Sequence, residues 1–366
     1  MRDKTKYYYA FSADERFSIS FADLLYKNFE DIELAWNCNY EKLVNTIGVT
    51  SKKAKAFIEY RDNIDVDKIY TDFLKTDISF ITIEDENYPT LLKEISNPPL
   101  WLYYKGNINL LSAQRKIAVV GSRRASTTGK NALTKILSEF ENSDLCIVSG
   151  MADGIDTTAH LTALKYNMPT IAVLGSGLNN IYPLKNRELF NNIIKANGLI
   201  LSEYPPLSPP IKFHFPLRNR IVSGISNCTL VAEAALHSGA LITARLCLEQ
   251  NRELMCIPGA INNPCTEGIY QLLKNGAGIV TCGNDILNYM NWQIKKSPNI
   301  IGKADIFSNL SAEEKSIAEI LGKDALTIDE LSYKTNLSIE KLMLILTNLE
   351  LQDIITQIEG EKYSLL

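Results

Sequence analysis

The sequence predicts an α/β protein: a Rossmann-like, doubly wound and mostly parallel sheet, with a small helical N-terminal domain and a C-terminal winged helix. Two observations predict the sheet. Short apolar runs alternate with helix-length stretches through the middle of the chain, and no charged residue interrupts any run. Such strands are buried on both faces, as in a parallel sheet that helices cover on each side. The runs span residues 117–120, 145–148, 170–174, 198–201, 229–231 and 254–257.

Length and composition favour several domains in a soluble protein. The chain has 366 residues, which exceeds one comfortable hydrophobic core. Its 46% hydrophobic and 22% charged residues are typical of globular proteins. The sequence has no apolar stretch of about eighteen residues and begins with polar residues, so we expect a cytoplasmic protein with no membrane partner.

Residues 1–80 predict a helical domain, because apolar residues such as Phe21, Leu25 and Phe29 recur at helical spacing. Within it, residues 43–58 have the form of a helix-hairpin-helix of the SAM-like kind. A glycine turn there would expose backbone N–H groups to a phosphate, with lysines nearby. A plain helical hairpin capped by Thr50 or Ser51 explains the same pattern equally well.

Residues 81–112 predict a connector packed on the sheet domain, because paired prolines mark a boundary. The sheet domain then spans residues 113–288, and residues 289–308 form a polar linker.

The end of the chain, residues 309–366, predicts a winged helix. Residues 303–366 carry 6 basic and 12 acidic side chains, so we expect this domain to contact protein rather than DNA. The expected helices and strands span residues 312–321, 328–335, 339–351, 354–358 and 363–365.

The seven cysteines lie far apart and several fall inside apolar runs, so we expect core residues in a reducing compartment. The sequence has no C-x-x-C pair, and its three histidines are widely separated. We therefore expect neither a metal site nor a cofactor.

The first apolar run ends in Gly121, Ser122 and Arg123, where a dinucleotide site would place more glycines. Gly121 supplies the turn, Ser122 can donate a hydroxyl, and the planar fork of Arg123 suits phosphate oxygens. Residues 112–288 carry a net charge of +4 between segments of −4 each, which favours a polyanionic ligand. In doubly wound sheets, ligands bind beyond the carboxyl ends of the strands.

Six motifs follow these strands in order, and together they resemble the DNA-processing protein A family, also called DprA or Smf. Thr128 and Tyr270 depart from the family pattern, where an aromatic residue and an asparagine are usual. The motifs are GSRRAS, SGMADGIDTTAH, AVLGSGLNNIYP, LSEYPP, FPLRNRIVSG and EAALHSGALITA.

The resemblance implies binding of single-stranded DNA, protection of incoming strands during natural transformation, and loading of RecA recombinase onto them. It also implies a homodimer. Our candidate dimer surface is residues 260–277, which include Ile261, Ile269, Leu272 and Leu273; the alternative is that these residues belong to the core.

The residues themselves suit a single strand. Arginines and lysines at the strand ends can contact phosphates, aromatic rings can stack on bases, and glycines allow close approach. The expected phosphate ligands are Arg123, Lys185, Arg218 and Arg220, and the expected stacking faces are Tyr182, Phe213, His214 and Phe215.

We expect Asp153, Asp156, Glu203 and Glu233 to act first as helix caps or arginine partners. The complete set of expected DNA-binding residues is Gly121, Ser122, Arg123, Ser126, Gly150, Gly154, Gly175, Gly177, Tyr182, Lys185, Phe215, Arg218, Asn219, Arg220, Ser238, Gly239 and Thr243.

The alternative is a nucleotide-binding or nucleotide-hydrolysing Rossmann-like enzyme related to phosphoribohydrolases, whose fingerprint resembles P-G-G-x-G-T-x-x-E. This chain has Pro258-Gly259-Ala260-Ile261 instead. It also lacks a nucleophile elbow and a P-loop. We therefore expect a binding protein and no catalytic residues.

Overall fold

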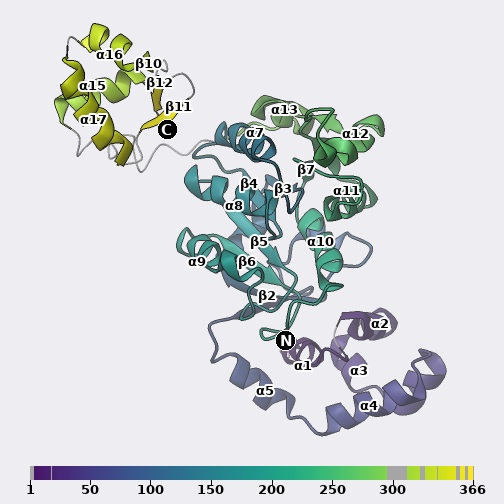
Figure 1. Ribbon diagram of the computed structural model, residues 1–366. Coiled ribbons are helices and arrows are strands. Elements are labelled where there is room, and N and C mark those ends of the chain that lie inside the picture. Colours follow the sequence, from purple (N-terminus) through teal and green to yellow (C-terminus); the bar gives the residue numbers. More distant parts are fainter. Residues whose placement is uncertain are drawn as a thin grey trace. The chain divides into compact units, whose positions relative to one another are not determined.

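The computed structural model describes residues 4–17, 19–294, 311–321, 326–335, 337–351, 355–358 and 362–365. The chain divides into two compact units, residues 1–297 and 298–366 (Figure 1). Part of the expected linker, residues 295–308, lies outside the described residues.

The first unit is built on a nine-stranded sheet with the order β1-β2-β6-β5-β4-β3-β7-β8-β9. The strands from β3 to β9 pair with one another in parallel, which confirms the predicted class. All six apolar runs form strands, shifted by at most one residue at each end. The parallel strands are β3 Lys116–Val120, β4 Cys146–Ser149, β5 Thr170–Leu174, β6 Leu199–Ser202, β7 Cys228–Val231, β8 Glu253–Cys256 and β9 Gly278–Ile279.

The expected connector supplies two strands of the same sheet. β1 (Ser79–Thr82) pairs antiparallel with β2 (Trp101–Gly106), and β2 pairs antiparallel with β6. Tyr103 lies opposite Ser202, almost a hundred residues further along the chain. The helix α6 (Thr90–Lys93) lies between β1 and β2, and the short 3-10 helix η2 (Ile108–Ser112) follows β2.

Helices cover both faces of the parallel strands (Figure 1). Ile117 and Val119 in β3 belong to a core that includes residues of α7, α8 and α13, whereas Ala118 and Val120 belong to a core with α10 and α11. Alternate residues of one strand thus face opposite layers. The helices are α7 Thr127–Ser138, α8 Ile155–Lys165, η3 Leu184–Asn186, α9 Arg187–Lys195, α10 His214–Gly224, α11 Gly239–Glu249, η4 Pro264–Thr266, α12 Glu267–Lys274 and α13 Gly283–Met290.

The N-terminal helices pack on the β2 side of the sheet through aromatic rings. Ser12 and Tyr103 share a buried hydrogen bond of 2.5 Å between their hydroxyls, and the Phe73 ring lies 5.9 Å from that of Tyr103. These helices therefore form one continuous core with the sheet. They are α1 Thr5–Ser12, α2 Ile19–Phe29, α3 Ile32–Trp36, the π-helix η1 Lys42–Thr46, α4 Ser51–Asp62 and α5 Val66–Phe73.

The expected hairpin within residues 43–58 is present. Gly48 turns the chain at a φ of 75°, which favours glycine. The Thr50 side chain accepts a hydrogen bond from the backbone N–H of Lys53 (3.4 Å) and caps α4. The capped hairpin explains this geometry, and phosphate binding by it stays a prediction.

The second unit has the elements of a winged helix. Its helices α15 (Ala312–Leu321), α16 (Ile328–Thr335) and α17 (Ile339–Leu351) have the predicted bounds. Its three strands are β10 (Leu326–Thr327), β11 (Ile355–Ile358) and β12 (Lys362–Leu365), in the order β10-β12-β11. The ammonium of Lys341, a lysine of α17, pairs with Glu313, so this cation is already neutralised.

All seven cysteines are free thiols, and five of them are buried as expected; Cys265 and Cys282 are partly exposed. Among the described residues, no helix is long and apolar enough to cross a membrane. The described residues also contain no cluster of three or more histidine, cysteine or carboxylate side chains that could hold a metal ion.

Candidate nucleic-acid interface

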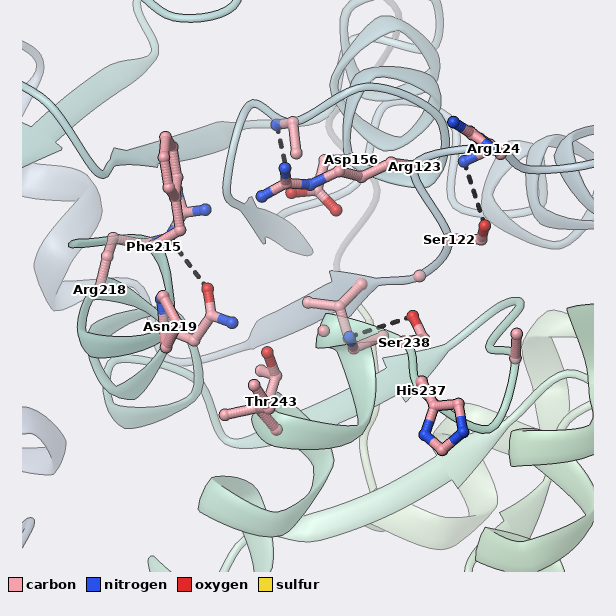
Figure 2. A pocket seen from close by; sticks show the side chains of 18 of the residues that line it. Ser122, Arg123, Arg124, Asp156, Phe215, Arg218, Asn219, His237, Ser238 and Thr243 are labelled. Atoms are coloured by element: carbon pink, nitrogen blue, oxygen red, sulfur yellow. Dashed lines mark hydrogen bonds between the residues drawn. The ribbon is translucent and has the colours of Figure 1, made fainter. Parts of the chain in front are cut away.

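A cavity of about 910 Å³ lies at the carboxyl ends of β3 and β7. The chain continues from β3 to β4 on one side and returns at β7 on the other, so this is the point where the strand order reverses. Ligands of doubly wound sheets bind in the crevice at such a point. Figure 2 shows Arg123 and Asp156 at one edge of the cavity and Phe215 and Asn219 on α10. It also shows Ser238 just before α11 and Thr243 within α11.

Ten of the predicted residues line the cavity. They come from the loop after β3, the loop after β5, α10, and the start of α11. They are Gly121, Ser122, Arg123, Tyr182, Phe215, Arg218, Asn219, Ser238, Gly239 and Thr243.

Arg123 is an exposed cation stacked on an aromatic ring. Its guanidinium carbon lies 5.3 Å from the centroid of the Phe215 ring. The Phe215 ring in turn lies 5.6 Å from the Tyr182 ring, at an angle of 50°. Because cation–π attraction and ring packing orient these groups, a flat face and a positive charge stand side by side at the cavity.

Gly175 makes room for this arrangement. A Cβ atom at residue 175 would lie 2.8 Å from the Phe215 ring, closer than van der Waals contact allows. Gly175 does not line the cavity itself, and its lack of a side chain gives the Phe215 ring its place.

Arg218 also lines the cavity, but it is buried and its hydrogen bonds are fixed. Its guanidinium donates to the backbone oxygens of Gly150 (2.6 Å) and Val173, and to the side-chain oxygen of Asn219 (3.1 Å). Burial lowers its pKa to about 10, while Asp156 acts in the opposite direction. Arg218 therefore stays charged at neutral pH. It supplies a fixed positive charge at the cavity and is not a mobile side chain.

Gly150, in the loop after β4, and Asp156, at the start of α8, help to fix the position of Arg218. A Cβ atom at residue 150 would lie 2.5 Å from the Arg218 guanidinium. The Asp156 carboxylate accepts hydrogen bonds from the backbone N–H groups of Gly150 (3.1 Å) and Ala152 (3.3 Å). Burial raises the pKa of Asp156, and the charge of Arg218 opposes this. Asp156 thus fixes the loop and faces an arginine, as predicted.

Ser126 and Glu233 are structural rather than exposed to the cavity. Glu233 accepts hydrogen bonds from the backbone N–H (2.8 Å) and hydroxyl (2.5 Å) of Ser126 and from the Asn263 amide (3.1 Å). Ser126 also caps α7 by accepting from the backbone N–H of Gly129 (3.0 Å). Glu233 therefore holds the loop after β3 in place.

Arg220 does not lie at the cavity, contrary to our expectation. It is buried, and its guanidinium donates two hydrogen bonds to the Glu203 carboxylate, at 2.8 and 2.6 Å. Arg218 and Arg220 are two residues apart on α10, and that spacing turns them to different sides of a helix. Glu203 is an arginine partner, as expected.

His214 is also unavailable for stacking on a base. Its ring stacks on the Tyr204 ring at 3.8 Å and 15°, on the inner side of α10. Burial lowers the pKa of His214. The first turn of α10 thus packs the half-buried His214 ring on Tyr204 and leaves Phe215 at the cavity.

Three further predicted residues lie outside the cavity lining. Lys185 forms an exposed ion pair with Asp153 at 3.0 Å. Gly154 adopts a φ of 77° beside the backbone of Ser122. Gly177 also lies against backbone, because a Cβ atom there would be 2.1 Å from the backbone oxygen of Pro205. Both glycines serve close packing of backbones.

Three basic residues that line the cavity were not predicted from the sequence. They are Arg124, Lys212 and His237. Lys212 stands three residues before Phe215, in the turn that leads into α10. This spacing was the signal that could have identified Lys212.

The fold and the cavity define a Rossmann-like protein with a cavity that is lined by arginine side chains and aromatic rings at the carboxyl ends of β3 and β7. Residues 79–291 match the family model described as DNA recombination-mediator protein A, and residues 307–361 match the DprA winged helix domain. The chain therefore belongs to the DNA recombination-mediator protein A (DprA) family.

Relatives and solved structures agree with this assignment. The chain is 41% identical over 258 residues to the DNA processing protein DprA of Streptococcus pneumoniae, covering 70% of this chain and 90% of that protein. The X-ray structure of DprA from Streptococcus pneumoniae matches with a TM-score of 0.68 and 36% identity, over 79% of this chain and 98% of that chain. A structure of DNA processing protein A from Helicobacter pylori, described as giving insights into its single-stranded DNA binding mode, matches with a TM-score of 0.53 and 32% identity, over 59% and 97%.

Proposed function

We propose that this protein binds single-stranded DNA in the cavity at β3 and β7, protects incoming strands, and loads RecA recombinase onto them during natural transformation. The proposal rests on the contact of Arg123 with the Phe215 ring and of that ring with Tyr182. These residues line a cavity that is also lined by the buried Arg218. Phosphates suit the cations and unpaired bases suit the rings. The single-stranded DNA binding mode described for the Helicobacter pylori relative supports the choice of ligand.

The proposed role is binding without catalysis. The two carboxylates that line the cavity are Asp156 and Glu267, and Asp156 is engaged with two backbone N–H groups. A nucleotide-hydrolysing enzyme is the alternative. Turnover of nucleotides or oligonucleotides incubated with the protein would favour that enzyme, whereas their retention unchanged would favour the binding protein.

Single-stranded DNA is expected to bind more tightly than a duplex of the same length, with an affinity that falls as salt rises. Stacking on Phe215 and Tyr182 requires unpaired bases. Each phosphate neutralised by Arg123, Lys212 or their neighbours should contribute a slope of about −0.7 in log K against log salt. Fluorescence anisotropy at several salt concentrations measures both. Equal affinity for the duplex contradicts the proposed ligand.

We also propose a homodimer formed through the segment after β8, because two cavities on one particle would hold a long strand by raising its effective concentration. The burial of individual residues narrows the candidate surface. Ile269 is fully buried and belongs to the core, whereas Ile261 is 89% exposed. Leu272 and Leu273 are partly buried.

The parent protein is expected to be a dimer at micromolar concentration, and Ile261→Asp is expected to shift it toward the monomer, because a buried carboxylate would oppose association. Light scattering after size-exclusion chromatography measures the mass. Leu161→Asp, on the exposed side of α8, is the matched control. A monomeric parent would contradict the dimer, and an unchanged Ile261→Asp variant would contradict this surface.

A further inference from the structure

The start of α10 directs four neighbouring side chains to three different surroundings. Lys212 and Phe215 line the cavity, and His214 stacks on Tyr204. Phe213 is 78% exposed to solvent. His214 and Phe215 each have a ring contact, whereas no ring contact is found for Phe213 among the described residues, so its exposure requires a separate explanation.

Phe213 is one of several exposed apolar side chains at and just before the start of α10, and we call this set the apolar patch. Leu217 follows it by one helical turn on the same face of α10, and Leu217 is exposed as well. Leu207 and Ile211, in the segment that leads to α10, are also exposed. Among the described residues, no aromatic ring packs against the Phe213 ring, whereas Phe215 has both a ring and a cation beside it. Grouped exposed apolar side chains mark a binding surface.

The chain that leads into α10 places Phe213 at the edge of the cavity. Phe213 is the N-cap of α10 and directly follows Lys212, a cation that lines the cavity. Pro216, in the first turn of α10, also lines the cavity. A strand that leaves the cavity past Lys212 therefore meets Phe213 next.

We propose that Phe213 is a second stacking platform, outside the cavity, for a base adjacent to the nucleotide held inside it. This inference rests on the proposed binding of single-stranded DNA and adds a subsite to it. The occupant is a nucleobase because the patch continues directly from a cation-lined cavity and is itself flanked by Lys212. Every base has a flat face, so the platform accepts any sequence.

The test compares binding of oligothymidylates of increasing length to the parent and to Phe213→Ala. On the shortest oligonucleotide that the parent binds, the two proteins are expected to bind equally, because the cavity alone is filled. On longer ones Phe213→Ala is expected to bind about 5-fold or more weakly, since one stacked base is lost. Phe213→Trp is expected to restore affinity, and its added fluorescence is expected to be quenched by the longer oligonucleotides alone.

Leu161→Ala, an exposed leucine on α8, is the matched control, and a thermal melt of each variant checks the fold. A Phe213→Ala variant that binds every length as the parent does overturns the platform. An equal loss at all lengths also overturns it, because Phe213 would then act on the cavity. If the parent binds no oligonucleotide of any length, the proposed function itself fails and the platform fails with it.

Discussion

Glu203→Ala is expected to lower the free energy of unfolding by about 3–5 kcal/mol, because it leaves a buried guanidinium without its partner. The side chains of Glu203 and Arg220 are 3% and 8% exposed. Burial alone would lower the pKa of Arg220, but the Glu203 carboxylate more than offsets this and keeps the pKa above its ordinary value. Arg220 also donates to the backbone oxygens of Asn97 and Leu217, so it ties α10 to the segment before β2.

Urea unfolding followed by circular dichroism measures this loss. The matched control is Glu249→Ala, which removes the partner of Arg245 from an exposed ion pair and should cost less than about 1 kcal/mol. Replacing Glu203 and Arg220 together by leucine and methionine should recover much of the stability, since no buried charge remains. If Glu203→Ala costs no more than Glu249→Ala, the buried pair does not stabilise this fold as described.

The parallel strands could be predicted because local sequence decides them. A strand buried on both faces is apolar along its whole length, and each such run here became a strand. The strands β1 and β2 were not predicted. The residues of β2 pair with partners that lie far along the chain, such as Tyr103 with Ser202. The local sequence does not indicate such a long-range pairing.

The cavity could be predicted in outline for a similar reason. Parallel strands bring their carboxyl ends to one edge, so residues after β3, β5 and β7 meet there. The error at Arg220 arose because its partner, Glu203, comes from a different segment of the chain. Arg218 and Arg123 were both predicted to contact phosphates. Arg218 is buried and its side chain is held by three hydrogen bonds, whereas Arg123 is exposed.

This difference changes what we expect of the two arginines. Arg218→Ala removes donors from the buried oxygens of Gly150 and Val173. Buried acceptors without partners cost stability, so this variant should unfold more easily as well as bind DNA less well. A loss of binding by Arg218→Ala therefore cannot by itself identify a phosphate contact.

Arg123→Ala is expected to weaken binding of single-stranded DNA by about 1–3 kcal/mol, or roughly 5- to 150-fold, and to leave the thermal melt unchanged. Its guanidinium is exposed, forms no ion pair among the described residues, and rests on the Phe215 ring. Its loss therefore removes a charge and a flat face but breaks no hydrogen bond or ion pair among the described residues, and Asp156 keeps Arg218 as a charge partner. Arg123→Lys keeps the charge but not the planar fork, so its affinity should lie between those of the parent and Arg123→Ala.

Titration of labelled oligothymidylate at several salt concentrations, beside a thermal melt, separates binding from folding. The slope of log K against log salt should become shallower by about 0.7 if Arg123 neutralises one phosphate. Arg245→Ala, which removes an exposed arginine outside the cavity lining, controls for the loss of one positive charge from the protein. If Arg123→Ala and Arg245→Ala weaken binding equally, the effect comes from net charge, and the strand does not contact this cavity through Arg123.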